Sequence, residues 1–229
     1  MFSIIRNLVK GGRLIIIGAG AFGHEIASYA EEIFHKLKDY KTKIMFIDDW
    51  EGAKSENPEW LLLDSSEWFQ GHKDDTYIIG LGDPKKRQVI AERYHEHEFN
   101  WATLVHPTAH VSDYAVIEPG CIVGPFATVS YRAVVSEHVV LNSYTAVGHH
   151  VQIGPYSVLS PKTLLAGKSV LEGANFIGSG SVVTPGRRIA YGARVSAGSV
   201  VYRNVKEGFT VLGNPAKVIS KSAPKNNLD

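Results

Sequence analysis

An unbroken sixfold repeat fills the second half of this chain. Residues 105–200 divide into sixteen consecutive blocks of six, and every block opens with Val, Leu or Ile. With 44% of the chain hydrophobic, such a run would arise by chance about twice in a million trials. The repeat is therefore a structural constraint. The opening residues are Val105, Val111, Ile117, Val123, Val129, Val135, Leu141, Val147, Ile153, Leu159, Leu165, Leu171, Ile177, Val183, Ile189 and Val195.

The other places of each block predict a short strand followed by a corner. The fifth place is small or short in most blocks, with Asn175 and Arg187 as departures. Proline and glycine gather at the third and fourth places, as in Pro119-Gly120. Proline suits the second residue of a type II turn, and glycine supplies the positive φ of the third. A chain that repeats strand and corner winds into a β-helix with its aliphatic row pointing inward.

A glycine-rich turn near the N-terminus predicts a different kind of fold. A short apolar run, 14–17, precedes Gly18-Ala19-Gly20-Ala21-Phe22-Gly23, which fits the pattern G-x-G-x-x-G. A helical pattern over 25–38 and a strand over 43–47 follow, and the strand ends in Asp48-Asp49. Such glycines let the backbone approach a phosphate, and the acidic pair is placed to meet a ribose hydroxyl. Three alternatives remain: a nicotinamide cofactor, a nucleotide sugar, or a turn without a ligand.

The rest of the N-terminal half predicts a small parallel sheet. We expect a strand over 77–82, a helix from 85 to about 95, and a last strand over 100–105. This length suffices for half of a dinucleotide fold, so a full dehydrogenase is excluded. We therefore predict a Rossmann-like domain over 1–104 and a β-helix domain with a C-terminal tail over 105–229. The run His95-Glu-His97-Glu98 resembles metal ligands, but at a polar helix end we interpret it as solvated charge.

Composition narrows the partners and the location. A net charge of +1 gives no reason to expect a nucleic acid or an anionic membrane as partner. The apolar run before Gly18 is too short for a signal peptide or a membrane span, which predicts a cytoplasmic protein without membrane insertion. The single cysteine, Cys121, occupies a small-residue place of the repeat. We therefore expect it to pack in the wall and not to act as a nucleophile.

A nucleotide-binding α/β unit followed by a β-helix resembles the NeuD/PglD-like sugar acetyltransferase family of hexapeptide-repeat acyltransferases. The resemblance implies a left-handed parallel β-helix with three hexads per coil, a little over five coils, and a homotrimer. It covers nearly the whole chain. It rests on Gly18-Ala19-Gly20, Phe46-Ile47-Asp48-Asp49, Ile79-Gly80-Leu81-Gly82, His106-Pro107, Leu141-Asn142-Ser143 and Val147-Gly148-His149.

The same resemblance implies an enzyme. It would move an acetyl group from acetyl-coenzyme A to the amino group of a nucleotide-linked amino-dideoxy sugar, in bacterial surface-glycan or glycoprotein biosynthesis, without a metal. The nucleotide (UDP, GDP or dTDP) stays open. Alternatives are O-acetylation of a sugar hydroxyl, as on sialic acid, and a non-catalytic trimer that binds a nucleotide sugar. The substrate-binding residues would be Gly18, Gly20, Phe22, Asp48, Asp49 and Gly80.

Acyl transfer needs a base for the incoming amine and donors for the oxyanion, and histidine titrates near working pH. His149 and His150 fall at the third and fourth places of their block, which predicts an outward corner. The resemblance assigns His149 as general base of a direct attack and the Gly167 N–H as oxyanion donor, and it places Asn142 near the reacting nitrogen. Coenzyme A would lie against Gly167, Ala166 and Lys217.

Two positions depart from the family pattern. His150 stands where an acidic residue usually orients the base, so either it works differently or Glu118 or Glu137 substitutes. Val158 stands where the family often has a histidine. Two rivals are weaker: the spacing of His138, His149 and His150 does not suit a zinc enzyme of the carbonic anhydrase kind, and the N-terminal half is too short for a nucleotidyltransferase.

Overall fold

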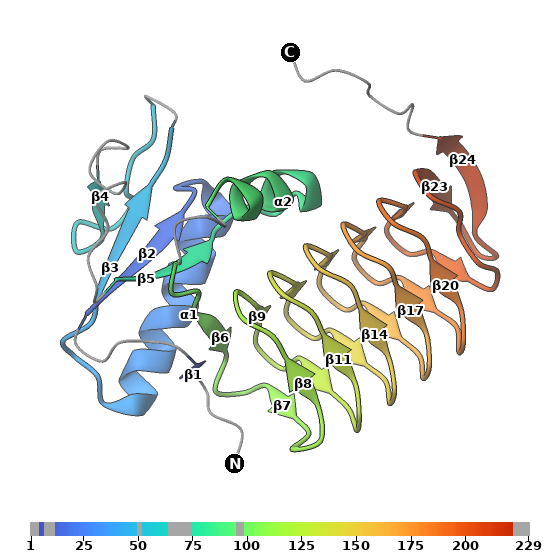
Figure 1. Ribbon diagram of the computed structural model, residues 1–229, viewed down its shortest axis with the longest axis horizontal. Coiled ribbons are helices and arrows are strands. Elements are labelled where there is room, and N and C mark those ends of the chain that lie inside the picture. Colours follow the sequence, from blue (N-terminus) through green and yellow to red (C-terminus); the bar gives the residue numbers. More distant parts are fainter. Residues whose placement is uncertain (1–4, 7–11, 50–51, 64–74, 95–98, 222–229) are drawn as a thin grey trace.

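The computed structural model describes residues 5–6, 12–49, 52–63, 75–94 and 99–221. Figure 1 shows a small α/β part at the N-terminal end of a long solenoid, with the last two strands at the far end. Residues 95–98, which include the two histidines interpreted as solvated charge, lie outside the described residues. Residues 222–229, at the end of the C-terminal tail, lie outside them too. Among the described helices, none combines the length and the apolar composition that crossing a membrane requires.

The α/β part is built on a four-stranded parallel sheet. Its strand order is β4-β3-β2-β5, the order of one half of a dinucleotide-binding fold with its next strand. The helix predicted over 25–38 begins earlier, since Gly20 takes an extended N-cap conformation (φ −76°, ψ 178°) directly after the turn. The elements are β2 (Arg13–Ile17), α1 (Ala21–Leu37), β3 (Lys43–Ile47), β4 (Leu61–Leu63), β5 (Asp75–Ile79) and α2 (Pro84–Arg93).

Both faces of this sheet are buried, which explains its nearly continuous apolar strands. Leu14 and Ile16 of β2 join the core that contains α1. Ile15 and Ile17 point the other way and pack with a cluster that includes Tyr77 and Tyr94. The short apolar run in the sequence is therefore a central strand of the sheet.

The repeat forms a parallel β-helix with three sheets. Sheet 1 has the order β1-β6-β9-β12-β15-β18-β21-β23-β24, sheet 2 β22-β19-β16-β13-β10-β7, and sheet 3 β20-β17-β14-β11-β8. Val140 pairs with both Ile122 and Val158, so each coil holds eighteen residues, or three hexads. Every opening residue of a block is buried except Val111, which is partly buried. The sixfold repeat therefore forms the core of the β-helix, as predicted.

The strands of the three sheets are short, and most contain two residues. Sheet 1 contains β1 (Ile5–Arg6), β6 (Thr103–Val105), β9 (Ile122–Val123), β12 (Val140–Leu141), β15 (Val158–Leu159), β18 (Phe176–Ile177), β21 (Arg194–Val195), β23 (Phe209–Leu212) and β24 (Lys217–Lys221). Sheet 2 contains β7 (His110–Val111), β10 (Thr128–Val129), β13 (Ala146–Val147), β16 (Leu164–Leu165), β19 (Val182–Val183) and β22 (Val200–Val201). Sheet 3 contains β8 (Val116–Ile117), β11 (Val134–Val135), β14 (Gln152–Ile153), β17 (Val170–Leu171) and β20 (Arg188–Ile189).

Glycine supplies the positive φ at some corners, as expected, for example at Gly120 with a φ of 77°, but other corners depart from this expectation. At the fourth place of consecutive blocks, glycine gives way to residues that usually avoid this conformation, at a cost of about 1–2 kcal/mol each. Side chains there point outward and stack along the helix axis, which offsets part of that cost. Phe126 stacks on Tyr144 with ring centroids 5.0 Å apart. The residues are Phe126, Arg132, His138, Tyr144, His150, Tyr156, Lys162, Lys168 and Ala174.

Sheet 1 is the face of the β-helix that the α/β part covers. The outward residues Ile122, Val140 and Val158 belong to the same buried cluster as Ile26 of α1. Val158 is only 2% exposed. The position where the family often has a histidine is therefore covered by the chain's own α/β part.

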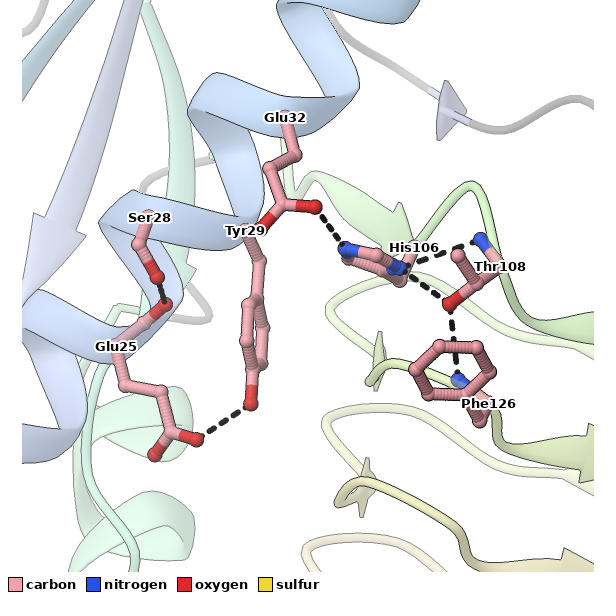
Figure 2. A network of polar contacts seen from close by, with 7 residues as sticks. All are labelled: Glu25, Ser28, Tyr29, Glu32, His106, Thr108 and Phe126. Atoms are coloured by element: carbon pink, nitrogen blue, oxygen red, sulfur yellow. Dashed lines mark hydrogen bonds and ion pairs between the residues drawn. The ribbon is translucent and has the colours of Figure 1, made fainter.

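His106 joins α1 to the first corner of the β-helix (Figure 2). Its Nδ1 accepts from the Thr108 N–H at 3.2 Å, so its Nε2 carries the hydrogen and donates to Glu32 Oε2 at 2.9 Å. Thr108 Oγ1 in turn accepts from the Phe126 N–H, one coil on, at 3.0 Å. The histidine of the His106-Pro107 motif therefore has a structural role, because it connects α1 to the first corner of the β-helix and, through Thr108, to the next coil.

Arg87 joins α2 to the corner between sheets 3 and 1. It is fully buried and donates to the carbonyl oxygens of Ile79 (2.7 Å), Leu81 (3.0 Å) and His138 (2.9 Å). Burial lowers the pKa of Arg87 to about 10. Burial first, and then the charge of Arg87, lowers the pKa of His138 to about 3, so His138 is neutral at working pH.

The inward and outward valines of β11 provide a matched test of the core. Val135 is fully buried, whereas Val134 on the same strand is partly exposed. We predict that Val135→Ala lowers the free energy of unfolding by about 2–3 kcal/mol, from the lost methyl groups and the cavity that remains. Val134→Ala should cost less than about 1 kcal/mol. Urea unfolding curves of both variants measure this, and equal costs would contradict the inward assignment of the repeat.

Candidate functional site

The glycine turn is held against the end of β3. Gly18 has a φ of 110°, which favours glycine, and its N–H donates to the Ile47 oxygen at 2.7 Å. The next N–H, of Ala19, donates to Asp48 Oδ2 at 2.8 Å. The first aspartate of the acidic pair therefore fixes the turn itself.

A cavity of about 100 Å³ opens beside this turn, at the carboxyl ends of β2, β3 and β5. Ligands of open parallel sheets bind at this edge. Three predicted residues line it, namely Gly18, Asp48 and Asp49, together with Ile17, Ile47, Leu81, Ile90 and Tyr94. The sequence did not reveal the lining residues Ile90 of α2 and Tyr94 at its C-cap, because a polar helix gives no sign of which side faces a ligand.

The other predicted residues of the turn have different surroundings. A Cβ on Gly80 would lie 2.8 Å from the Gly18 oxygen, so this glycine allows two loops to approach closely. A Cβ on Gly20 would meet nothing within 4 Å, and Gly20 is the exposed N-cap of α1. Phe22 packs against the core that includes α1. Of these three, none lines the cavity.

His149 and His150 lie at the corner between sheets 2 and 3, directly after β13. Both are exposed, as predicted for an outward corner. Their Nδ1 atoms are 3.2 Å apart. His150 has a φ of 57°, and its N–H donates to the Tyr131 oxygen of the preceding coil at 3.0 Å. The corner therefore presents two imidazoles in contact with each other.

Gly167 lies one coil above His149, at the same corner. A Cβ on Gly167 would lie 2.5 Å from His149 Nε2, so only glycine leaves room for the ring. Within the described parts of the chain, the Gly167 N–H has no hydrogen-bond partner. The structure therefore brings together a histidine nitrogen and a free amide donor, the pair that acyl transfer requires.

Comparisons with known proteins agree with both halves of this architecture. Residues 13–94 match the family model described as the PglD N-terminal domain. A GDP-perosamine N-acetyltransferase of Escherichia coli O157:H7 is 30% identical over 114 residues, which are 50% of this chain and 52% of that protein. The match thus spans about half the length of this relative.

Solved structures match nearly the whole chain. The acetyltransferase domain of PglB from Neisseria gonorrhoeae FA1090 is 26% identical, with a TM-score of 0.82 over 90% of this chain and 99% of that one. These likenesses agree with the resemblance to the NeuD/PglD-like sugar acetyltransferases. PerB from Caulobacter crescentus, at 23% identity and a TM-score of 0.77 over 91% of this chain and 98% of that one, shows the same fold. These matches confirm the Rossmann-like sheet followed by a left-handed β-helix.

Other residues expected at the catalytic site lie apart from His149 within one chain. Asn142 lies at the corner between sheets 1 and 2, where its side chain donates to the Leu159 oxygen at 3.0 Å. Lys217 begins the exposed strand β24 at the end of sheet 1. Ala166 precedes Gly167, and its N–H donates to the Val183 oxygen. Only Gly167 and His150 contact the proposed base.

The carboxylates considered as substitutes lie at a different corner. Glu118 and Glu137 lie between sheets 3 and 1, where Glu118 Oε2 accepts from the Glu137 N–H at 3.1 Å. His138 is at that corner too, so the three histidines of the zinc alternative do not meet in one chain. Among the described residues, no three His, Cys, Asp or Glu side chains group as a metal site would require.

The cavity at the glycine turn belongs to the α/β part, and His149 belongs to a corner of the β-helix. The α/β part covers sheet 1, and the corner between sheets 2 and 3 is the one edge of the prism that does not border sheet 1. One copy of the chain therefore does not bring its own cavity and its own His149 together.

Cys121 has the surroundings of a packed residue. It is fully buried, its Sγ donates to the Ser136 oxygen at 3.0 Å, and burial raises its pKa to about 12. Because the shift is upward, only about one thiol in ten thousand is ionised at pH 8. We predict no reaction with a disulfide reagent in the folded protein at pH 8, and one reactive thiol in guanidinium. Fast labelling of the native chain would contradict this packing.

Proposed function

We propose that this protein is an acetyl-coenzyme A-dependent N-acetyltransferase that acts on the amino group of a nucleotide-linked amino-dideoxy sugar. The observation that carries the proposal is that the His149 ring fills the space beside Gly167, whose N–H has no hydrogen-bond partner among the described residues. Support also comes from the 26% identical PglB domain, which has a structure in complex with acetyl coenzyme A. The E. coli relative is named for the sugar nucleotide GDP-perosamine.

The proposed reaction is a direct attack in a ternary complex. The amine nitrogen attacks the acetyl carbon of the thioester, His149 Nε2 takes the amine proton, and the Gly167 N–H stabilises the tetrahedral oxyanion. The carbon–sulfur bond then breaks, and the proton passes from His149 to the thiolate. Coenzyme A is placed along Gly167, Ala166 and Lys217, and Asn142 near the sugar. No step uses a metal, and the buried Cys121 takes no part.

The nucleotide is placed at the glycine turn. The N-terminus of α1 has no side-chain cap and no acidic residue in its first turn, which suits the negative charge of a diphosphate. Asp49 lines the cavity and pairs with Arg93 at 3.3 Å, and we place it near the ribose or the base. UDP, GDP and dTDP sugars remain candidates. We place the reaction in the cytoplasm, in the biosynthesis of bacterial surface-glycan or glycoprotein sugars.

A homotrimer would complete the site. Sheet 2 presents apolar side chains such as Leu164, which is 39% exposed. Phe126 and Tyr144 stack at its edge and are 51% and 55% exposed. We propose that a second copy covers this surface and brings its nucleotide cavity to His149.

A thiol-release assay over UDP-, GDP- and dTDP-linked 3-amino and 4-amino sugars tests the activity. We predict turnover with at least one sugar, and a fall in kcat of about 10²–10⁴-fold in His149→Ala, from loss of the base. His35→Ala, on the exposed side of α1, is the matched control and should keep full turnover. Acetylation of a hydroxyl group of the sugar would favour the alternative activity, O-acetylation. No thiol release with any sugar would favour the non-catalytic trimer, which the loss of a histidine at Val158 also supports.

Mixed oligomers test whether the site is shared between copies. Ile90→Trp should fill the cavity, and His149→Ala removes the base, so each variant alone should be inactive. If each site takes His149 from one copy and the cavity from another, random mixing leaves about a quarter of the sites intact. We predict that co-expressed variants regain roughly that fraction of wild-type activity. A mixture without activity would show that both parts come from one chain.

A further inference from the structure

We infer that His150 is a positioning residue: its Nδ1 accepts a hydrogen bond from the His149 Nδ1–H and so leaves His149 Nε2 free to take a proton. The inference rests on the proposed function, because it concerns the base of that reaction. The two Nδ1 atoms are 3.2 Å apart, and the ring planes cross at 84°. His150 thereby replaces the acidic residue that usually follows the base in the family.

A neutral imidazole carries its hydrogen on one nitrogen only, and the other nitrogen accepts. A contact between two Nδ1 atoms therefore holds one hydrogen, which belongs to either His149 or His150. If His150 donates it, His149 carries its own hydrogen on Nε2 and has no lone pair to offer a substrate. If His149 donates it, Nε2 is bare and faces Gly167. Only this second arrangement produces a base, and it requires His150 to be neutral with its hydrogen on Nε2.

The backbone fixes the direction of His150. Its φ of 57° and the bond from its N–H to the Tyr131 oxygen at 3.0 Å hold it in the left-handed corner conformation. The Tyr131 ring lies edge-on to the His150 ring, with centroids 5.7 Å apart and planes at 71°. The backbone and the ring of Tyr131, in the coil below, thus orient His150, the hydrogen-bond acceptor.

The charged groups around the pair come from the coils on either side. Below, the Arg132 guanidinium lies 5.2 Å from the centre of the Tyr131 ring. Above, the N–H of Lys168 donates to the His149 oxygen at 2.9 Å, and its side chain is exposed.

A neutral imidazole at position 150 should have a different effect on the base than a carboxylate would. After His149 took the proton, a carboxylate at this position would form an ion pair with it, whereas the neutral His150 ring forms only a hydrogen bond. Protonated His149 should therefore give the proton to the leaving thiolate more readily beside His150 than beside a carboxylate.

The position of the hydrogens is measurable without substrate. Full-length protein labelled with ¹⁵N-histidine, at pH 8, gives long-range proton–nitrogen correlations that distinguish protonated from bare ring nitrogens; His149→Gln and His150→Asn assign the signals. We expect hydrogen on Nδ1 of His149 and on Nε2 of His150. Hydrogen on Nε2 of His149 would overturn the inference. If the wild type releases no thiol with any sugar, the proposed function fails, but these spectra still decide between the two arrangements.

Kinetics of matched variants test the consequence. Asn tolerates the left-handed conformation and offers an oxygen acceptor, and Ala occupies it at Ala174 with a φ of 47° but offers none. We predict that His150→Asn keeps kcat within about threefold, whereas His150→Ala lowers kcat about 10- to 100-fold with little change in KM. Lys162→Ala makes the same corner replacement elsewhere (φ 61°) and should leave both constants unchanged. Equal kcat in His150→Ala and the wild type would overturn the role.

Discussion

The parallel register of eighteen residues is the constraint on which the rest of the structure depends. Each inward aliphatic residue meets the same kind of residue one coil above and one coil below, as Leu141 meets Val123 and Leu159. Because every coil repeats this geometry, each third place and each fourth place falls on one of three straight edges. The edges are therefore rigid supports, and a side chain at a corner has a fixed neighbour eighteen residues away in either direction.

That rigidity explains how an exposed histidine acquires a defined environment. His149 lies on a corner in water, yet Gly167 must be glycine because the ring occupies the space of its side chain. His150 is held from the coil below, where its N–H and its ring both contact Tyr131. A base on a loop would need other loops to orient it. Here the preceding and following coils supply the contacts, and they do so before any substrate binds.

The sequence predicted the features that depend on periodicity and missed those that depend on contacts between the two halves. The inward row, the glycine turn and the outward corner at His149 follow from spacing, whereas the three hexads per coil were implied by the family resemblance. Arg87 stands in the polar run Pro84-Lys85-Lys86-Arg87, which is typical of a solvated helix, yet it is fully buried because three carbonyl oxygens meet it. The burial of Val158 was equally hidden, since a repeat does not say which of three faces another domain covers.

The same reasoning separates the two kinds of unusual residue at the corners. Large residues in the left-handed conformation, such as Phe126 and Tyr144, are stabilised by stacking on each other, so they need no functional explanation. His150 adopts the conformation too, but its ring turns to the residue beside it, and its Nδ1 contacts His149 and not a ring on the next coil. Arg132 and Lys168 hold the same place one coil below and one coil above, so face-to-face ring stacking does not offset the cost of the left-handed conformation at His150. An orienting role for the base accounts for that cost, whereas a purely structural role for the corner does not.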